Sequence, residues 1–236
     1  MLKTFAPQTS VRARWTAAAC AALLLPATGF AALPAGTSFE TTPAGSTASP
    51  VTTVNSDGID ITIRDFTLSG GGFSSGFAEV QNRVYIPLAS PFGDAEQELE
   101  LNNVFAEFDF GGNPTLLQFD YAFLGGDSNL QVNGAVDSVS GGLSQILGVA
   151  LGGAVSTTNG SYNGIDFQLT AQLTGGNNEI GRLLLGDGVT PITAFGVGGQ
   201  EFAIDSIRAV PEPAGALALG GLGTVLLARR RGRKTS

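Results

Sequence analysis

The chain has 236 residues, of which 43% are hydrophobic and 14% are charged, and it contains no histidine and a single cysteine, Cys20. This composition excludes a Ser-His-Asp triad and a His-ligated zinc site, and it leaves no partner for a disulfide within the chain. Residues 32–213 hold four of the 12 basic residues and all 20 acidic ones, a net charge of −16 that should repel nucleic acid and anionic lipid.

The first 31 residues have the order of a secretory signal peptide. Three basic residues precede an apolar segment at 15–25 (WTAAACAALLL), and small residues lead to a predicted cleavage site after Ala31. A retained amphipathic helix is the alternative interpretation. Cleavage would remove Cys20, and the mature protein would then have to be stabilised without a disulfide.

Residues 32–58 are predicted to form an N-terminal arm with a first strand, and the polar stretch 41–53 is expected to be a loop. Residues 59–209 are predicted to form one antiparallel β-sandwich or jelly-roll domain, because apolar residues alternate with a period of two and Gly/Asn/Asp clusters separate the runs. The segment 143–151 (LSQILGVAL) fits a short helix or a strand. The predicted strands are 59–68, 79–88, 103–110, 115–124, 129–136, 164–174 and 200–209.

The segments 119–126 (FDYAFLGG) and 129–134 (NLQVNG) predict a strand–turn–strand hairpin. Together they resemble exported jelly-roll domains that are often found upstream of a C-terminal sorting signal. That resemblance implies a β-sandwich body and no defined activity.

The chain ends with a motif, an apolar run and a basic tail. Residues 214–228 are apolar apart from Thr224 and would span ~22 Å as a helix, which is short for a ~30 Å hydrocarbon core. Arginines after the run could extend along it and keep the tail cytoplasmic, so a single transmembrane helix is predicted, with the body outside. A buried core helix is the alternative. The flanking basic residues are Arg229, Arg230, Arg231 and Arg233, and the preceding motif is Val210, Pro211, Glu212 and Pro213.

These last 27 residues resemble the PEP-CTERM sorting signal of Gram-negative bacteria. The resemblance implies that residues 210–236 direct export and that exosortase, a membrane-embedded protease-transpeptidase, processes the chain near the Pro-Glu-Pro motif. It also implies a location at the cell surface or in an extracellular, biofilm-forming polysaccharide matrix. The two prolines hold the chain extended, which suits a substrate presented to a protease.

Two acidic residues near the ends of the predicted body suggest a metal site. Glu40 lies just after the predicted mature N-terminus, and Asp205 lies on the last predicted strand. The pair resembles carbohydrate-binding jelly rolls in which a Glu and an Asp at such positions share a structural calcium ion, although Ser206 stands where that family often has a second acid. The alternative is that both acids are solvated at a sheet edge.

Carboxylate chemistry remains the acid–base chemistry open to this chain, and a glycosidase needs two carboxylates ~5–10 Å apart. Glu107 and Asp109 share a strand face, but alternation along a half-buried strand explains that spacing equally well. Sugars could also stack on Tyr85, Tyr121 or Tyr162. We therefore predict a non-catalytic, exported surface or matrix protein with no cofactor, and keep a calcium-dependent carbohydrate-binding module and a glycan-active enzyme as alternatives.

Overall fold

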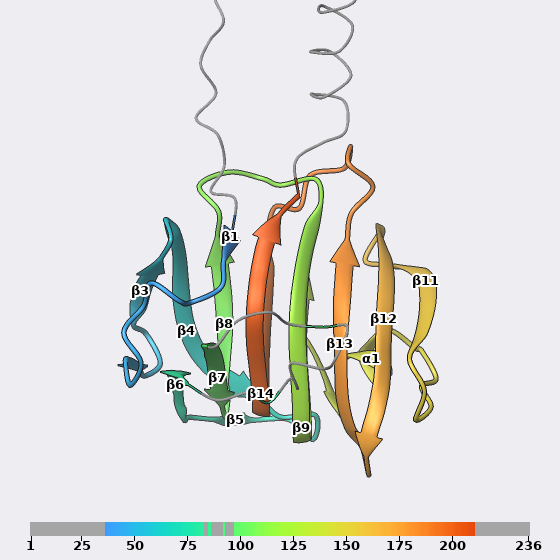
Figure 1. Ribbon diagram of the computed structural model, residues 1–236, viewed down its shortest axis with the longest axis horizontal. Coiled ribbons are helices and arrows are strands. Elements are labelled where there is room, and N and C mark those ends of the chain that lie inside the picture. Colours follow the sequence, from blue (N-terminus) through green and yellow to red (C-terminus); the bar gives the residue numbers. More distant parts are fainter. Residues whose placement is uncertain (1–35, 83–84, 86–91, 93–96, 211–236) are drawn as a thin grey trace, which may run out of the picture. The chain divides into compact units, whose positions relative to one another are not determined.

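The computed structural model describes residues 36–82, 85, 92 and 97–210. Almost all regular elements in this part of the chain are antiparallel strands, which confirms the predicted all-β class (Figure 1). The strands are β1 (Gly36–Thr37), β2 (Thr47–Ala48), β3 (Thr53–Ser56), β4 (Ile59–Thr67), β5 (Phe73–Ser74), β6 (Phe77–Gln81), β7 (Glu98–Asn102), β8 (Val104–Asp109), β9 (Leu117–Val132), β10 (Asp137–Ser140), β11 (Ser156–Tyr162), β12 (Ile165–Gly175), β13 (Asn178–Leu185) and β14 (Phe195–Ala209).

The two longest strands, β9 and β14, pair with each other along most of their length and form the centre of one large antiparallel sheet. Along its edge away from β9, strand β14 pairs in turn with β8, β7 and β1. Along its edge away from β14, strand β9 pairs first with β13 and then with β10. The remaining strands continue outward from these, so that β11, β12 and β13 form one end of the sheet order and β7, β6 and β2 form the other.

Both central strands bend near their midpoints. In β9 the bend falls at Gly125 and Gly126, whose φ angles of 150° and 84° are disfavoured for other residues. In β14 the register with β9 shifts between Gly199 and Phe202, directly opposite the β9 bend. Glycine at these positions lets two adjacent strands turn together without losing their pairing.

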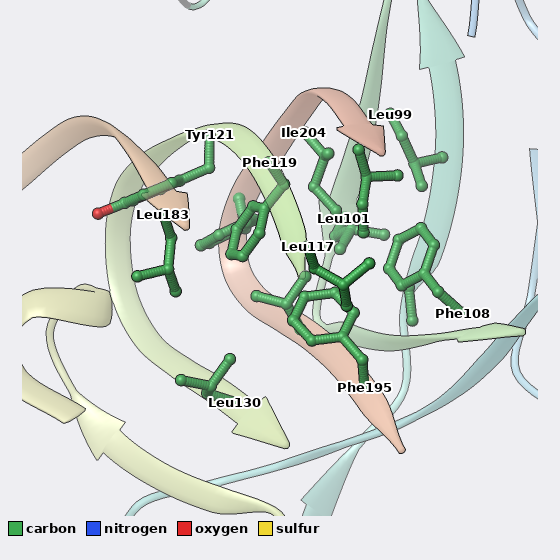
Figure 2. Close-up of a cluster of buried hydrophobic side chains, with 14 of the residues drawn as sticks. Leu99, Leu101, Phe108, Leu117, Phe119, Tyr121, Leu130, Leu183, Phe195 and Ile204 are labelled. Atoms are coloured by element: carbon green, nitrogen blue, oxygen red, sulfur yellow. The ribbon is translucent and has the colours of Figure 1, made fainter. Parts of the chain in front are cut away.

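The bends are large enough to bring opposite ends of the paired strands β9 and β14 into contact. Phe119 lies opposite Ile207, 12 residues beyond Phe195 on β14, which would be ~40 Å away on a straight strand. Yet the rings of Phe119 and Phe195 lie 5.3 Å apart. Figure 2 shows the two strands curling around this cluster, which also contains Phe108 and Leu130. The sheet therefore curls over a single main apolar core.

The predicted hairpin at 119–134 is wrong. Residues 117–132 form one continuous strand, and both of its halves pair with β14 rather than with each other. The glycines at 125 and 126 were interpreted as a turn, but the backbone bends there without reversing. The Asn- and Gly-containing stretch 157–164, one of the clusters expected to separate strands, is likewise mostly strand β11, and only Asn163 and Gly164 lie between β11 and β12.

The predicted strands 59–68, 103–110, 115–124, 164–174 and 200–209 match observed strands, with shifted ends. The ambiguous segment 143–151 begins with a short helix, α1 (Leu143–Ile146). The predicted strand 79–88 is confirmed only for 79–81, since residues 83–84 and 86–88 lie outside the described part. Strands β7, β10, β11 and β13 were not predicted.

Among the described residues, no helix has the length and apolar character needed to cross a membrane. The predicted signal peptide (1–31) and the predicted membrane helix (214–228) lie outside the described residues, as do Pro211, Glu212, Pro213 and the four tail arginines.

The close approach of β14 to β8 yields a stability prediction. A Cβ atom added at Gly198 would lie 2.3 Å from the Val104 carbonyl oxygen, and backbone cannot rotate away as a side chain can. We expect Gly198→Ala to lower the free energy of unfolding by about 1–3 kcal/mol, measured by urea denaturation. Gly152→Ala is the control, since nothing lies within 4 Å of its added Cβ. Equal stability of the two variants would contradict this account of the β8–β14 contact.

Candidate functional site

A buried carboxyl group lies beside a partly enclosed cavity. The cavity has a volume of about 240 Å³ and is lined by Ser140, Gly141, Gly142, Ser144, Gln145, Leu151, Leu173, Asn177 and Glu179. Glu179 begins β13 after the turn from β12, and its side chain is on the core side of the strand, as are those of Leu183 and Leu185. Only 1% of its surface is exposed.

Three donors converge on the Glu179 carboxyl. The Tyr121 hydroxyl donates to Oε1, the Ser144 hydroxyl donates to Oε2 over 2.5 Å, and the Ser144 backbone N–H donates to Oε1 over 3.2 Å. Two glycines make room for this arrangement. A Cβ at Gly142 would lie 2.5 Å from Oε2 of Glu179, and one at Gly181 would lie 3.1 Å from the Tyr121 hydroxyl.

Burial dominates the proton affinity of this group. Loss of solvation raises the pKa of Glu179, although the hydrogen bonds from Ser144 and Tyr121 act in the opposite direction. The pKa of Tyr121 is raised well above its ordinary value by burial and by the adjacent carboxyl. The phenol therefore stays protonated at neutral pH and serves as a donor. Its ring stacks on Phe202 with centroids 5.6 Å apart, which fixes the hydroxyl in place.

The arrangement fits an anchor better than a catalytic centre. Glu179 is the only acid lining the cavity, so the two-carboxylate mechanism of a glycosidase is absent there. Its three donors come from β9 and from the first turn of α1, so the carboxyl ties the loop that carries α1 to the central strands.

The buried carboxyl predicts how stability depends on pH. Because the pKa of Glu179 is raised on folding, its protonated form is favoured in the fold, and that stabilisation is lost as the pH rises through the folded-state pKa. We expect the free energy of unfolding of the wild type to fall relative to Glu179→Gln as the pH rises above the ordinary pKa of a glutamate, about 4.3. The exposed Glu201→Gln is the control. Parallel pH profiles for the wild type and Glu179→Gln would contradict the prediction.

A second group of buried acids lies on the opposite face of the same strands. Asp120, which alternates with the inward Phe119 and Tyr121, is 1% exposed and receives two hydrogen bonds from Arg182, at 2.6 and 2.7 Å. Glu98 on β7 is fully buried and accepts from the backbone N–H of Tyr85 at 2.9 Å. A small apolar cluster of Phe92, Ala122, Ile180 and Ala203 belongs to this face.

The two ion pairs of the described residues should differ in strength. The Asp120 side chain in the Arg182 pair is 2% exposed, whereas Arg64 and Glu107 are 49% and 36% exposed. We expect Arg182→Gln to lower the free energy of unfolding by about 1–3 kcal/mol, because it removes the ion pair and both guanidinium hydrogen bonds from the buried Asp120 carboxylate. The partial exposure of Arg182 keeps this loss below that of a fully buried pair. Arg64→Gln should cost less than about 1 kcal/mol. Thermal unfolding of both variants tests this, and a larger loss for Arg64→Gln would contradict it.

The two acids predicted to share calcium have different surroundings. Glu40 is exposed and accepts from the backbone N–H of Gln97 at 2.7 Å, whereas Asp205 is 1% exposed on β14. The alternative in which both are solvated is therefore wrong for Asp205. Among the described residues, no three acids are grouped so that they could hold a metal ion. The calcium site stays a prediction.

The structure also places the other residues that were considered for sugar chemistry. Glu107 and Asp109 line one open hollow of about 410 Å³, which confirms that they share a face. Glu107 pairs with Arg64 at 2.8 Å, and Asp109 accepts from the backbone N–H of Gly111. Sugar stacking on Tyr121 is excluded because that residue is completely buried.

The contacts among Glu179, Tyr121 and Ser144 were not foreseen. Alternation of residue types marked 115–124 as a strand, but nothing local showed which acid faces the core. In comparisons with known proteins, the chain matches no family model, no curated protein and no solved structure. Its function is therefore argued from its own residues and their geometry.

Proposed function

We propose that this chain is an exported, exosortase-processed surface or extracellular-matrix protein whose β body is non-catalytic. One observation carries the proposal: the first and last described strands are neighbours. Gly36 lies opposite Arg208 and Thr37 lies opposite Ile207 in an antiparallel pair. The first and last described strands therefore lie side by side. A signal peptide before β1 and a C-terminal anchor after β14 would then be joined to neighbouring points of the body.

The position of the Pro-Glu-Pro motif supports the same proposal. The Val210 backbone N–H donates to the Leu116 carbonyl at 2.9 Å, the last hydrogen bond of the described chain. Pro211 follows immediately and has no N–H to extend the pairing. The motif thus begins where sheet pairing ends, which suits recognition of an extended segment by exosortase at the membrane surface.

For the fold we propose a two-layered β-sandwich of the jelly-roll kind. The contact between Phe119 and Phe195 supports it, since β9 and β14 bend and their two halves contribute to one core. Such a body would be stable without disulfides, as the predicted mature chain requires.

The charge and the surface chemistry support a structural rather than an enzymatic role. The net charge of −16 over residues 32–213 would keep the body soluble and away from nucleic acid. The two acids considered for glycan chemistry are engaged, Glu107 by Arg64 and Asp109 by the backbone N–H of Gly111. The partners proposed are exosortase, the membrane through residues 214–228 before processing, and an exopolysaccharide layer afterwards.

Intact-mass spectrometry of the protein recovered from a Gram-negative host, with and without exosortase, tests the proposal. We expect loss of residues 1–31 in both hosts, and loss of the residues after about Pro213 only when exosortase is present. A Pro211→Ala, Pro213→Ala double variant should keep the tail. Retention of the RRRGRK tail in the exosortase-positive host would overturn the sorting proposal, and retention of residues 1–31 would overturn export by a cleaved signal.

A further inference from the structure

Strand β11 forms one outer edge of the sheet and is unlike the other edges. It pairs with β12 over all seven of its residues, from Ser156 opposite Ala171 to Tyr162 opposite Ile165, without a register shift. No described strand pairs with its other side, so a row of backbone N–H and C=O groups is free to bond a further strand (Figure 1). Five of the seven residues are exposed and the other two are partly exposed.

The other edges of the described sheet are protected and β11 is not. Strands β1, β2 and β5 have two residues each, and β3 and β10 have four, so these outermost strands are too short to template a partner strand. The sequence of β11, STTNGSY, has no proline, no lysine and no bulge. These are the features with which sheet proteins usually prevent edge pairing. A regular seven-residue edge without them is suited to adding a strand.

The charge distribution indicates which molecule supplies the strand that pairs with β11. The body carries −16 over residues 32–213, so two copies repel each other over most of their surfaces. Strand β11 carries no charge, and its partner β12 has a single charged residue, Asp166. Its outward side chains Thr157, Asn159 and Ser161 are hydroxyls and an amide that hydrogen-bond well with their own kind.

We propose that β11 is a self-association surface, and that two copies of the chain pair through antiparallel β11 strands around a two-fold axis. Full overlap of the seven residues places Asn159 opposite Asn159 of the second copy and Thr157 opposite Ser161. Each pair then joins uncharged polar side chains, and the sheet continues from one copy into the next. A contact of this length is small, so the pairing is weak in dilute solution and strengthens where the local concentration of copies is high.

Disulfide trapping in the full-length chain tests this register. In a Cys20→Ser background, Asn159→Cys should form a cross-linked dimer under mild oxidation, because opposite Cβ atoms in an antiparallel pair lie ~5 Å apart. Thr157→Cys and Ser161→Cys should cross-link poorly alone but well when mixed. Gln168→Cys is the control: it lies opposite Asn159 on β12, one strand away from the edge, and should not cross-link.

Sedimentation of the full-length chain in a mild detergent gives an independent measurement. Thr157→Glu with Ser161→Glu should raise the dimer dissociation constant at least about tenfold, because like charges would face each other across the pair. The matched control adds the same two charges at Val51 and Val189, which are 82% and 77% exposed, and should change it little.

Three results would overturn the proposal. Cross-linking of Asn159→Cys no stronger than that of Gln168→Cys would exclude pairing through β11. Efficient cross-linking of Thr157→Cys and Ser161→Cys each with itself would show parallel rather than antiparallel strands. Equal weakening of the dimer by the two pairs of added charges would show a general charge effect rather than a contact at this edge.

Discussion

The pairing of β9 with β14 is the constraint on which the rest of the structure depends. Every other strand of the main sheet order joins through one of these two, and the apolar core is enclosed because both bend at the same level. The bend needs small residues on both strands, Gly125 and Gly126 on one and Gly199 on the other. The same pairing aligns the last residues of β14 with β1, and so determines where the two ends of the body emerge.

The sheet buries acidic side chains on both of its faces, and the interactions that stabilise them differ between the two faces. Glu179 stays inside by accepting three hydrogen bonds and by favouring its protonated form, whereas Asp120 is matched by the guanidinium of Arg182. The remaining acids are mostly at the surface, where they keep copies of the chain apart except at the uncharged β11 edge. Neither arrangement resembles a pair of carboxylates set around a substrate.

The sequence pattern was sufficient for the all-β class, because strands such as β4 alternate between buried and more exposed residues over most of their length. It was insufficient at Gly125 and Gly126, since glycine is equally suited to a turn and to a bend, and pairing with a distant strand decides between them. It also failed for β11, whose sequence STTNGSY has no apolar period at all. The inward direction of Glu179 could not be predicted, because alternation divides a strand into two faces without saying which face meets the core. The predicted targeting segments lie outside the described residues and stay predictions.

The direction of β11 has a consequence for how displayed copies would be arranged. Successive antiparallel pairings from β11 through β12, β13 and β9 to β14 make β11 run in the same sense as the end of β14, toward the point where the chain leaves the body. An antiparallel pair of β11 strands therefore points the attachment ends of two copies away from each other. Copies anchored side by side on one cell would have to tilt to pair, whereas copies on two facing cells would meet without distortion. The geometry of one edge strand would thus favour adhesion between neighbouring cells over clustering on a single one.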